Sequence, residues 1–307
     1  MVKKDKKNVN VLAIILGTVL VLYVISMIIP LFWTLMTTVK TPTEYNAGLN
    51  TTGVLKRNQL WLPKKLTLQN YITAYKEFFI LVEVEYQGDI YDVQYGVLAQ
   101  FINSIKFAVG SAFAMTLTSL IMGYAAARFK YKFSEYIYIF VLVTMALPIV
   151  GSLPSEIATA QGLGIFDTFL GIWIMRSTFL NTYFLIFYAQ FKMIPQDYTE
   201  AAKIDGASPL MVMAKIIVPL AAGTTSAVFV LNFIALWNDF QIPMIYLPSH
   251  PVAAYGMYQF SNKADLDIAN IPTRLACIYL LAFPIIVFYA IFNKKLNVNL
   301  SVGGIKG

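Results

Sequence analysis

The chain has 307 residues, of which 58% are hydrophobic and only 13% are charged, and its mean hydropathy is +0.64. Charged residues approach a quarter of an ordinary soluble domain, so this composition indicates a polytopic membrane protein. The net charge of +7 does not indicate nucleic-acid binding. That function needs basic residues gathered with aromatic residues on a water-facing surface, whereas here Lys and Arg mostly flank apolar runs.

Cysteine and histidine each occur once, which restricts the chemistry of the chain. Cys277 lies inside an apolar stretch and His250 lies in a loop between two prolines. Neither a disulfide framework nor a Cys and His metal site can be built from them. A lone loop histidine without further polar context does not make a catalytic site. We therefore expect no catalytic residue, no bound metal and no cofactor of the chain's own.

Apolar runs predict membrane-spanning helices, because about 20 apolar residues cross the hydrocarbon core with every backbone amide bonded internally. Six stretches qualify, at residues 9–33, 98–127, 136–153, 168–191, 219–237 and 275–293. The first lacks the short apolar core and cleavage site of a signal peptide, so we expect it to be retained. The second and third are expected to form a hairpin turned by a basic loop. The predicted fold class is all-α integral membrane with six transmembrane helices.

Basic residues set the expected orientation, because they favour cytoplasmic loops. With both termini in the cytoplasm, the inner segments are residues 1–8, 128–135, 192–215 and 294–307, and each carries Lys or Arg. The outer segment 154–167 carries none. The expected divisions are residues 1–33 for the tail and first helix, 34–97 for an extracytoplasmic segment, 98–293 for the transmembrane core and 294–307 for a cytoplasmic tail.

The extracytoplasmic segment contains a strand pattern. Residues 81–87 and 90–95 alternate with a period of two, and Gly88-Asp89 between them suits a two-residue turn. The pattern predicts a small β-hairpin. Two roles stay open, a lid over the helix ends or a contact for an external protein.

The chain shows neither of two common ways to power transport. It contains no phosphate-binding loop ending in Gly-Lys and a hydroxyl residue, and its final Gly303 to Gly307 run has neither the spacing nor a following helix. Apart from Arg176 the expected spans are nearly free of charge, whereas ion-coupled transporters usually place several acids in the membrane. A membrane-embedded enzyme would also need clustered polar groups, and none are evident.

The loop between the fourth and fifth spans, residues 193–219, has a distinctive design. Pro195 and Asp197 suit a helix start, two alanines follow, and Gly206 can take the left-handed backbone that ends a helix. The residues predict a short helix, a tight turn and a second helix from about Leu210. Small side chains would let a partner's groove close around the first helix, and Glu200 offers a carboxylate. The same features suit an ordinary helix-turn-helix connection.

This loop resembles the EAA signature of binding-protein-dependent ABC importer permeases, with Val218 where Leu is usual before the final proline. Nearly the whole chain resembles the carbohydrate branch, the subunit similar to the G component of the maltose transporter. The matching segments are Pro30 to Trp33, Leu68 to Tyr71, Asn103-Ser104, Tyr124 to Phe129, Leu163-Gly164, Trp237 to Phe240 and Gly303 to Gly307.

The resemblance implies that the loop helix sits in a cleft of a separate ATPase and transmits its closure. Glu200 would pair with a basic residue there, Ala201 and Ala202 would pack in the cleft, and Gly206 would make the turn. The residues so assigned to ATPase coupling are Glu200, Ala201, Ala202, Asp205, Gly206 and Pro219. The tail residues assigned to ATPase contact are Gly303, Gly304 and Lys306.

The implied function is import of a sugar or oligosaccharide by alternating access across a bacterial plasma membrane. The expected partners are a second permease subunit, two copies of the ATPase that bind ATP, an extracytoplasmic solute-binding protein and membrane lipid. A non-sugar solute such as a polyamine is the alternative. Candidates for the solute path are Arg176, Asn232, Trp237, Asn238 and Asp239. Trp237 could instead belong to the interfacial aromatic belt, and Arg176 could either pair inside the bundle or extend outward.

Overall fold

A computed structural model describes residues 11–46, 62–86, 88–129, 132–147, 151–262 and 270–300. The predicted tail contacts Gly303, Gly304 and Lys306 lie outside these ranges. The chain divides into two compact units, one of residues 1–77 with 260–280 and one of residues 78–259 with 281–307. Each unit is described by itself.

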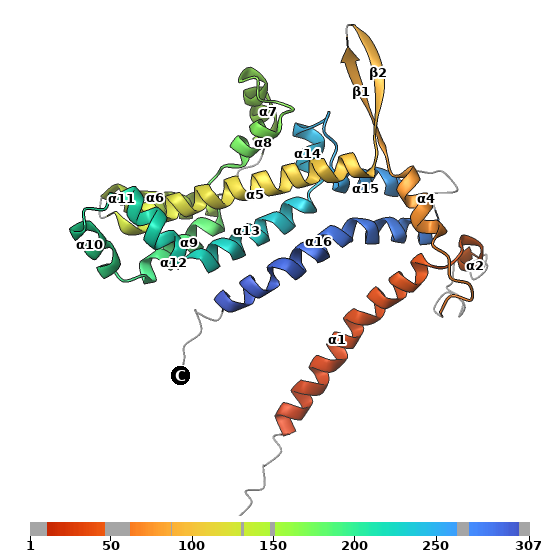
Figure 1. The fold of residues 1–307 in the computed structure, drawn as a ribbon, viewed down its shortest axis with the longest axis horizontal. Coiled ribbons are helices and arrows are strands. Elements are labelled where there is room, and N and C mark those ends of the chain that lie inside the picture. Colours follow the sequence, from red (N-terminus) through yellow and green to blue (C-terminus); the bar gives the residue numbers. More distant parts are fainter. Residues whose placement is uncertain are drawn as a thin grey trace, which may run out of the picture. The chain divides into compact units, whose positions relative to one another are not determined.

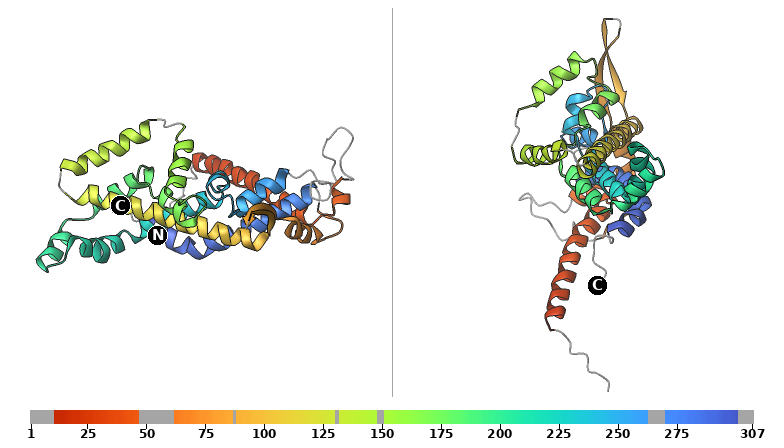
Figure 2. Two further views of the ribbon diagram at one scale, coloured as in Figure 1. Left: turned by 90° about the horizontal axis from the view of Figure 1, so that it is seen from above. Right: turned by 90° about the vertical axis from the view of Figure 1, so that its left-hand side faces the viewer.

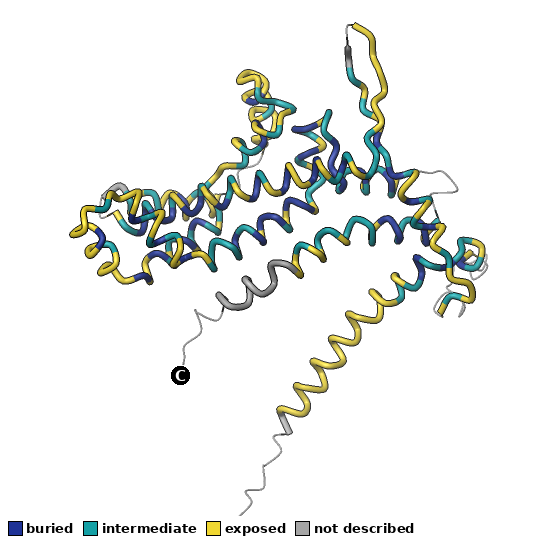
Figure 3. Tube along the Cα trace, viewed as in Figure 1, coloured by how far each residue is buried: buried dark blue, intermediate teal, exposed yellow. Residues whose placement is uncertain are grey.

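The first unit contains α1 (Val11–Thr38), α2 (Pro42–Asn46), α4 (Gln69–Glu77) and the first part of α16 (Ile271–Leu300). The apolar side chains of α1 are exposed over most of its length (Figure 3). A helix that is hydrophobic all round and exposed has the composition of a lipid-facing span.

Asn70 holds the first unit together at the end of α1. Its Nδ2 donates to the carbonyl oxygens of Thr38, at 2.6 Å, and Lys40, at 2.7 Å, and its Oδ1 accepts from Thr273 at 3.4 Å. The neighbouring Tyr71 hydroxyl lies 2.8 Å from Oγ1 of Thr38. The last carbonyls of a helix lack partners within it, so this buried amide supplies donors that water cannot reach. The Leu68 to Tyr71 segment therefore fastens α4 to the end of α1.

The second unit is built around α5 (Val97–Arg128), with α8 (Phe169–Arg176), α9 (Thr182–Met193) and α13 (Ala222–Trp237) packed along it (Figure 1). The unit also contains the helices α6 (Lys132–Ala146), α7 (Leu153–Gly162) and α14 (Gln241–Tyr246) and most of α15 (Ala253–Asn262). Gly123 allows α5 and α9 to approach closely, because a Cβ there would lie 2.7 Å from Cβ of Phe187. α5 is thus the helix against which α8, α9 and α13 pack.

The predicted β-hairpin is present in this unit. Strands β1 (Ile80–Tyr86) and β2 (Asp89–Tyr95) pair antiparallel, with Ile80 opposite Tyr95 and Tyr86 opposite Asp89. The turn precedes Asp89, one residue earlier than expected, because Asp89 belongs to the ladder. Gly88 has a φ of 90°, a backbone conformation that glycine adopts without steric cost.

Three helices in the described part of the chain are long and apolar enough to cross a membrane. They are Ala13–Thr38, Val97–Arg128 and Ile271–Ala290, and they correspond to the first, second and sixth predicted spans. Residues Pro209–Leu220 and Ala222–Trp237 form a pair bent by 78° that would make a fourth. The predicted fifth helix therefore begins at Ala222 instead of Pro219, because the bend separates it from the preceding segment.

The predicted fourth span, residues 168–191 with Arg176 within it, is divided into two helices. The structure has α8 and α9, separated by residues 177–181. Asn181 starts α9, since its Oδ1 accepts from the backbone N–H groups of Tyr183, at 3.0 Å, and Phe184, at 3.2 Å. A side chain that caps a new helix competes with continuation of the old one. The third stretch is also shorter than predicted, since α6 ends at Ala146 and Pro148 lies outside the described residues.

Candidate functional site: the loop between α9 and α13

The loop begins with α10 (Asp197–Ile204), which starts at the predicted Asp197. Its end is a Schellman turn, in which the Gly206 N–H donates to the Lys203 carbonyl, at 3.0 Å, and the Ala207 N–H to the Ala202 carbonyl, at 2.9 Å. Gly206 has a φ of 78°, so the predicted left-handed turn is confirmed. This conformation costs little only for glycine and, to a lesser degree, asparagine.

A second helical segment follows the turn, as predicted. Oγ of Ser208 caps α11 (Pro209–Val212) by accepting from the Met211 N–H at 3.3 Å. The chain continues as a π-helical turn, η1 (Met213–Ile217), and then α12 (Val218–Leu220). Pro219 lies in α12, directly after the π-helical turn, so its missing N–H leaves a carbonyl of the preceding turn without a helical donor. The 78° bend at Ala221 then redirects the chain into α13.

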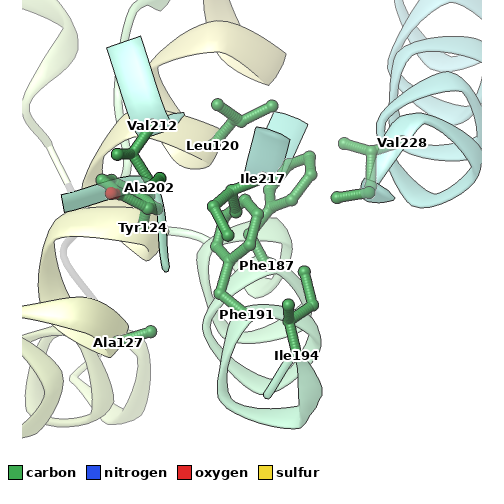
Figure 4. Packing of buried hydrophobic residues seen from close by; sticks show 11 residues of the cluster. Leu120, Tyr124, Ala127, Phe187, Phe191, Ile194, Ala202, Val212, Ile217 and Val228 are labelled. Atoms are coloured by element: carbon green, nitrogen blue, oxygen red, sulfur yellow. The ribbon is translucent and has the colours of Figure 1, made fainter. Parts of the chain in front are cut away.

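The inner side of this loop is anchored in a hydrophobic cluster (Figure 4). Ala202 is buried there against residues of α5, α9 and η1 that include Tyr124, Phe187, Phe191 and Ile217. A larger side chain at Ala202 would hold α10 away from these rings. Within this chain Ala202 therefore packs into the hydrophobic cluster and anchors α10 to it.

The outer side of the loop is exposed. Glu200, Ala201, Asp205 and Gly206 all face solvent. They lie among large apolar side chains, since Ile204 is 87% exposed and Leu210 is 73% exposed. Apolar side chains beside an exposed carboxylate, on a rigid two-helix turn, are the composition expected of a protein contact.

A cavity of about 480 Å³ lies behind the loop. Phe113 and Leu117 of α5, Met213 of η1, Val218 of α12 and Phe229 of α13 contribute to its mostly apolar lining. π-helical turns are rare and cost backbone regularity, so they often mark places where a helix changes its path. The segment that joins α10 to α13 thus combines a π-turn, a bend and adjacent free volume.

Arg176 and Asp239, two predicted solute-path residues, form an ion pair. Nη2 of Arg176 lies 3.6 Å from Oδ2 of Asp239, and both side chains are partly exposed. Sequence reasoning left open whether Arg176 is paired, and the structure shows that it is. Beside this pair, the Tyr246 hydroxyl donates to Oε2 of Glu156 at 2.8 Å, a contact that sequence reasoning missed.

Of the other solute-path candidates, Asn232 and Trp237 are buried and Asn238 is exposed. Trp237 is 6% exposed, with its ring centroid 5.6 Å from that of Phe233, so it belongs to the core of the unit. Asn232 is buried and donates to Oγ1 of Thr116 at 3.2 Å. Asn238 donates to the Ile234 carbonyl at 2.8 Å and so closes the end of α13. The structure brings Arg176 and Asp239 together but assigns these three residues to packing and hydrogen bonding within the chain.

Asn103 and Ser104, noted in the sequence without a role, hold the segment before α15. Nδ2 of Asn103 donates to the Pro251 carbonyl at 3.1 Å, and Oγ of Ser104 accepts from the Ala253 N–H at 2.8 Å. No group of three metal-ligating side chains occurs among the described residues. Nothing in the sequence signals these long-range partners, because they lie about 150 residues away.

The structure combines helices that are long and apolar enough to cross a membrane with an exposed helix-turn-helix loop. Residues 115–298 match the model of the binding-protein-dependent transport system inner membrane component family, and the chain belongs to this family. It is therefore a multi-pass membrane protein and a permease subunit of an ABC transport system.

Curated relatives cover nearly the full chain. The diacetylchitobiose uptake system permease protein of Streptomyces coelicolor is 24% identical over 95% of this chain and 88% of its own length. The trehalose transport system permease protein of Mycobacterium tuberculosis is 27% identical over 86% of this chain and 90% of its own length. A solved bacterial ABC transporter involved in the import of the acidic polysaccharide alginate shares the fold. Its chain has a TM-score of 0.70 at 19% identity and covers 95% of this chain and 99% of its own.

Proposed function

We propose that this chain is one of two permease subunits in a heterodimeric ABC importer for a sugar or oligosaccharide. Two ATPase subunits bind ATP on the cytoplasmic side, and a separate solute-binding protein delivers the sugar on the other side. The sugar assignment is supported by the relatives, which are named for diacetylchitobiose and trehalose uptake. It is also supported by a further relative named for the transport of starch degradation products in Thermoanaerobacterium thermosulfurigenes.

The observation that carries the proposal is the two-sided loop. The exposed side, with Glu200, Ala201 and Ile204, supplies the contact with the ATPase. A basic residue of the ATPase pairs with Glu200, and an apolar cleft covers Ile204 and Leu210. The buried side, with Ala202, transfers any displacement of α10 to the cluster on α5 and α9. A rigid turn that is held on one side and exposed on the other is suited to transmit force.

Alternating access follows from this transmission. When ATP closes the ATPase pair, α10 moves with it and pulls on η1 and α12. These segments can pivot at the bend at Ala221 and repack into the neighbouring cavity. Packed interfaces exchange between discrete arrangements, so a small displacement of the loop can switch the bundle between inward-open and outward-open states.

The proposed topology keeps six crossings with both termini in the cytoplasm. The broken pair α8 and α9 forms one crossing, and the bent pair that ends in α13 forms another. Broken helices occur in transporters where neighbouring protein satisfies the freed backbone groups. The basic tail, with Gly303, Gly304 and Lys306, then contacts the ATPase pair. Arg176 and Asp239 line the solute path, where a sugar hydroxyl replaces one side chain of the ion pair as the hydrogen-bond partner of the other.

Charge reversal at Glu200 tests the coupling assignment. Glu200→Lys should reduce co-purification of the ATPase or separate ATP hydrolysis from sugar uptake, and Glu200→Gln should have a smaller effect. The matched control is Glu135→Lys, which makes the same charge change at an exposed acid of α6 in the same unit. Full uptake by Glu200→Lys, with normal co-purification, would refute the assignment.

The solute is tested separately with the wild-type transporter. The purified cognate solute-binding protein should bind one of a panel of mono- and oligosaccharides. Uptake of that sugar should require ATP and both permease subunits. Binding of polyamines in place of every sugar in the panel would contradict the sugar assignment and leave the ABC permease assignment intact.

A further inference from the structure

The hairpin β1–β2 is firmly anchored at its base. Phe78 and Ile80, at the start of β1, are buried, and Nε2 of Gln100 on α5 donates to the Tyr95 carbonyl at 2.7 Å. Gly256 of α15 lies so close that a Cβ there would meet the side chains of Gln100 and Phe78. The base of the hairpin therefore moves together with α5 and α15.

Beyond its base the hairpin projects from the unit and stays exposed (Figures 1 and 3). In the strand register Val82 faces Val93 and Val84 faces Tyr91, so these four side chains share one face. Tyr91 is 52% exposed and Val93 is 39% exposed, so this apolar face has no cover within the described unit. An isolated two-stranded hairpin is only marginally stable in water. The geometry thus leaves an apolar surface that a partner would stabilise.

The opposite face mixes acidic and apolar residues, since Leu81 pairs with Gln94, Glu83 with Asp92 and Glu85 with Ile90. Glu83 lies directly across from Asp92, and like charges in this position destabilise a strand pair. The sequences of the two strands contain the acids Glu83, Glu85, Asp89 and Asp92 and no lysine, arginine or histidine. A cationic surface placed against Glu83 and Asp92 would remove their repulsion.

The location of the hairpin restricts the partner. The hairpin and α10 lie at opposite ends of α5 in two perpendicular views (Figure 1; Figure 2, left). At 1.5 Å per residue, the 32 residues of α5 extend about 48 Å, which exceeds the thickness of a bilayer core. If α10 contacts the cytoplasmic ATPase, the hairpin lies on the side from which the solute-binding protein approaches.

We propose that the hairpin is a docking element for the solute-binding protein, and that it fits a basic patch next to a small apolar surface of that protein. This inference rests on the proposed function. The acidic side chains make a solute-binding protein a better partner than a lipid surface, because anionic headgroups repel carboxylates. The acidic side chains also make a solute-binding protein a better partner than the second permease, because permanent interfaces are depleted of charge at their centre. Charged, exposed contacts are suited to a transient complex whose encounter is steered by electrostatic attraction.

The test measures association of the cognate solute-binding protein with the purified complete transporter in lipid nanodiscs. Glu83→Lys with Asp92→Lys should slow association by about tenfold or more at low salt, and the difference should shrink at high salt. Glu83→Lys alone places Lys across from Asp92, which stabilises the strand pair while reducing its negative charge. A slower association of this single variant would therefore report docking and not loss of the hairpin.

Glu83→Thr with Asp92→Thr is the structural control, since a cross-strand Thr pair keeps strand propensity and removes both charges. Its association should lie between those of the wild type and the double lysine variant. Unchanged association of the double lysine variant would overturn the inference while wild-type binding upholds the proposed function. Loss of the second permease from the double lysine complex would assign the hairpin to the subunit interface instead. Absence of binding to the wild-type transporter would count against the proposed function itself.

Discussion

Asp239 uses its two carboxylate oxygens for two different elements. Oδ2 lies 3.6 Å from Nη2 of Arg176 at the end of α8, while Oδ1 accepts from the N–H groups of Gln241, at 3.0 Å, and Ile242, at 3.2 Å, at the start of α14. One side chain thus ties α8 to the junction between α13 and α14. If the solute path passes here, movement of α8 must either carry this junction along or break the ion pair.

Asp239→Asn and Asp239→Ala should separate the two contacts. The amide of Asn keeps an oxygen for the start of α14 and loses the charge, so we expect a loss of about 0.5–1 kcal/mol, as for a partly exposed ion pair. Ala also removes the helix cap, which adds about 1 kcal/mol. Thermal unfolding of the purified protein in detergent should give the order wild type, Asn, Ala. Equal melting temperatures for all three would show that neither contact stabilises the junction.

Substitutions at Gly206 should act through the backbone. A Cβ there meets nothing within 4 Å, so no clash is involved, but the φ of 78° is unfavourable for a branched residue. Gly206→Val should cost about 1–2 kcal/mol locally, displace the end of α10 and reduce ATPase co-purification. Gly206→Asn has a side chain of similar size and tolerates the left-handed region, so it should retain most coupling. Equal loss in both variants would indicate that side-chain size matters instead.

Gly110 permits the contact between α5 and α8. A Cβ at this position would meet the indole ring of Trp173, whose Nε1 donates to the Lys106 carbonyl at 3.1 Å. Gly110→Ala should therefore displace the ring and lower stability by about 1–3 kcal/mol. Gly17→Ala in α1 is the matched control, since no atom lies within 4 Å of its added Cβ. Its helix should be unchanged or slightly more stable. A melting temperature unaffected by Gly110→Ala would contradict this packing.

The bond between Glu156 and Tyr246 predicts a dependence of stability on pH. Side-chain hydrogen bonding from Ser152, then from Tyr246, lowers the pKa of the Glu156 carboxyl below its ordinary value of 4.5. Burial, followed by the bond to Glu156, raises the pKa of Tyr246 to about 12. A lowered carboxyl pKa stabilises the fold above the unfolded value, and this contribution is lost as the pH falls through the folded value. A raised Tyr pKa stabilises below the unfolded value and is lost as the pH rises toward 12.

The variant Tyr246→Phe tests this dependence of stability on pH. Its melting temperature should fall below that of the wild type at pH 7, and the difference should narrow as the pH falls below the ordinary carboxyl pKa of 4.5 and through the lowered pKa of Glu156 in the folded protein. Ser177→Ala is a suitable control, because Oγ of Ser177 bonds only to the Trp173 carbonyl of its own helix at 2.8 Å in the described contacts. A difference between Tyr246→Phe and wild type that is constant from pH 7 to pH 3.5 would contradict the ionic character of the bond.

Local chemistry made several elements predictable from the sequence. Long, mostly apolar runs predicted α1, α5 and the apolar part of α16, because a chain in lipid must satisfy its amides within each segment. The strict alternation near Glu83 and Asp92 predicted the hairpin, and Gly206 predicted the end of α10. Each of these depends on residues that are close in sequence. The family resemblance likewise rests on such local signatures.

Tertiary structure decided what depends on partners far apart in the chain. Asn181 divides the fourth apolar stretch, and the bend at Ala221 separates Pro219 from α13. Hydropathy alone indicates neither interruption. Only packing shows that Ala202 points into its own subunit while Ala201 faces outward, and that Trp237 is buried. The pairing of Arg176 with Asp239 requires α8 to meet the end of α13. Hydropathy and backbone preference were enough to predict α1, α5, the apolar part of α16 and the turn at the end of α10. Which side chains of the loop are exposed depends on the tertiary fold, because burial depends on neighbours that no local pattern specifies.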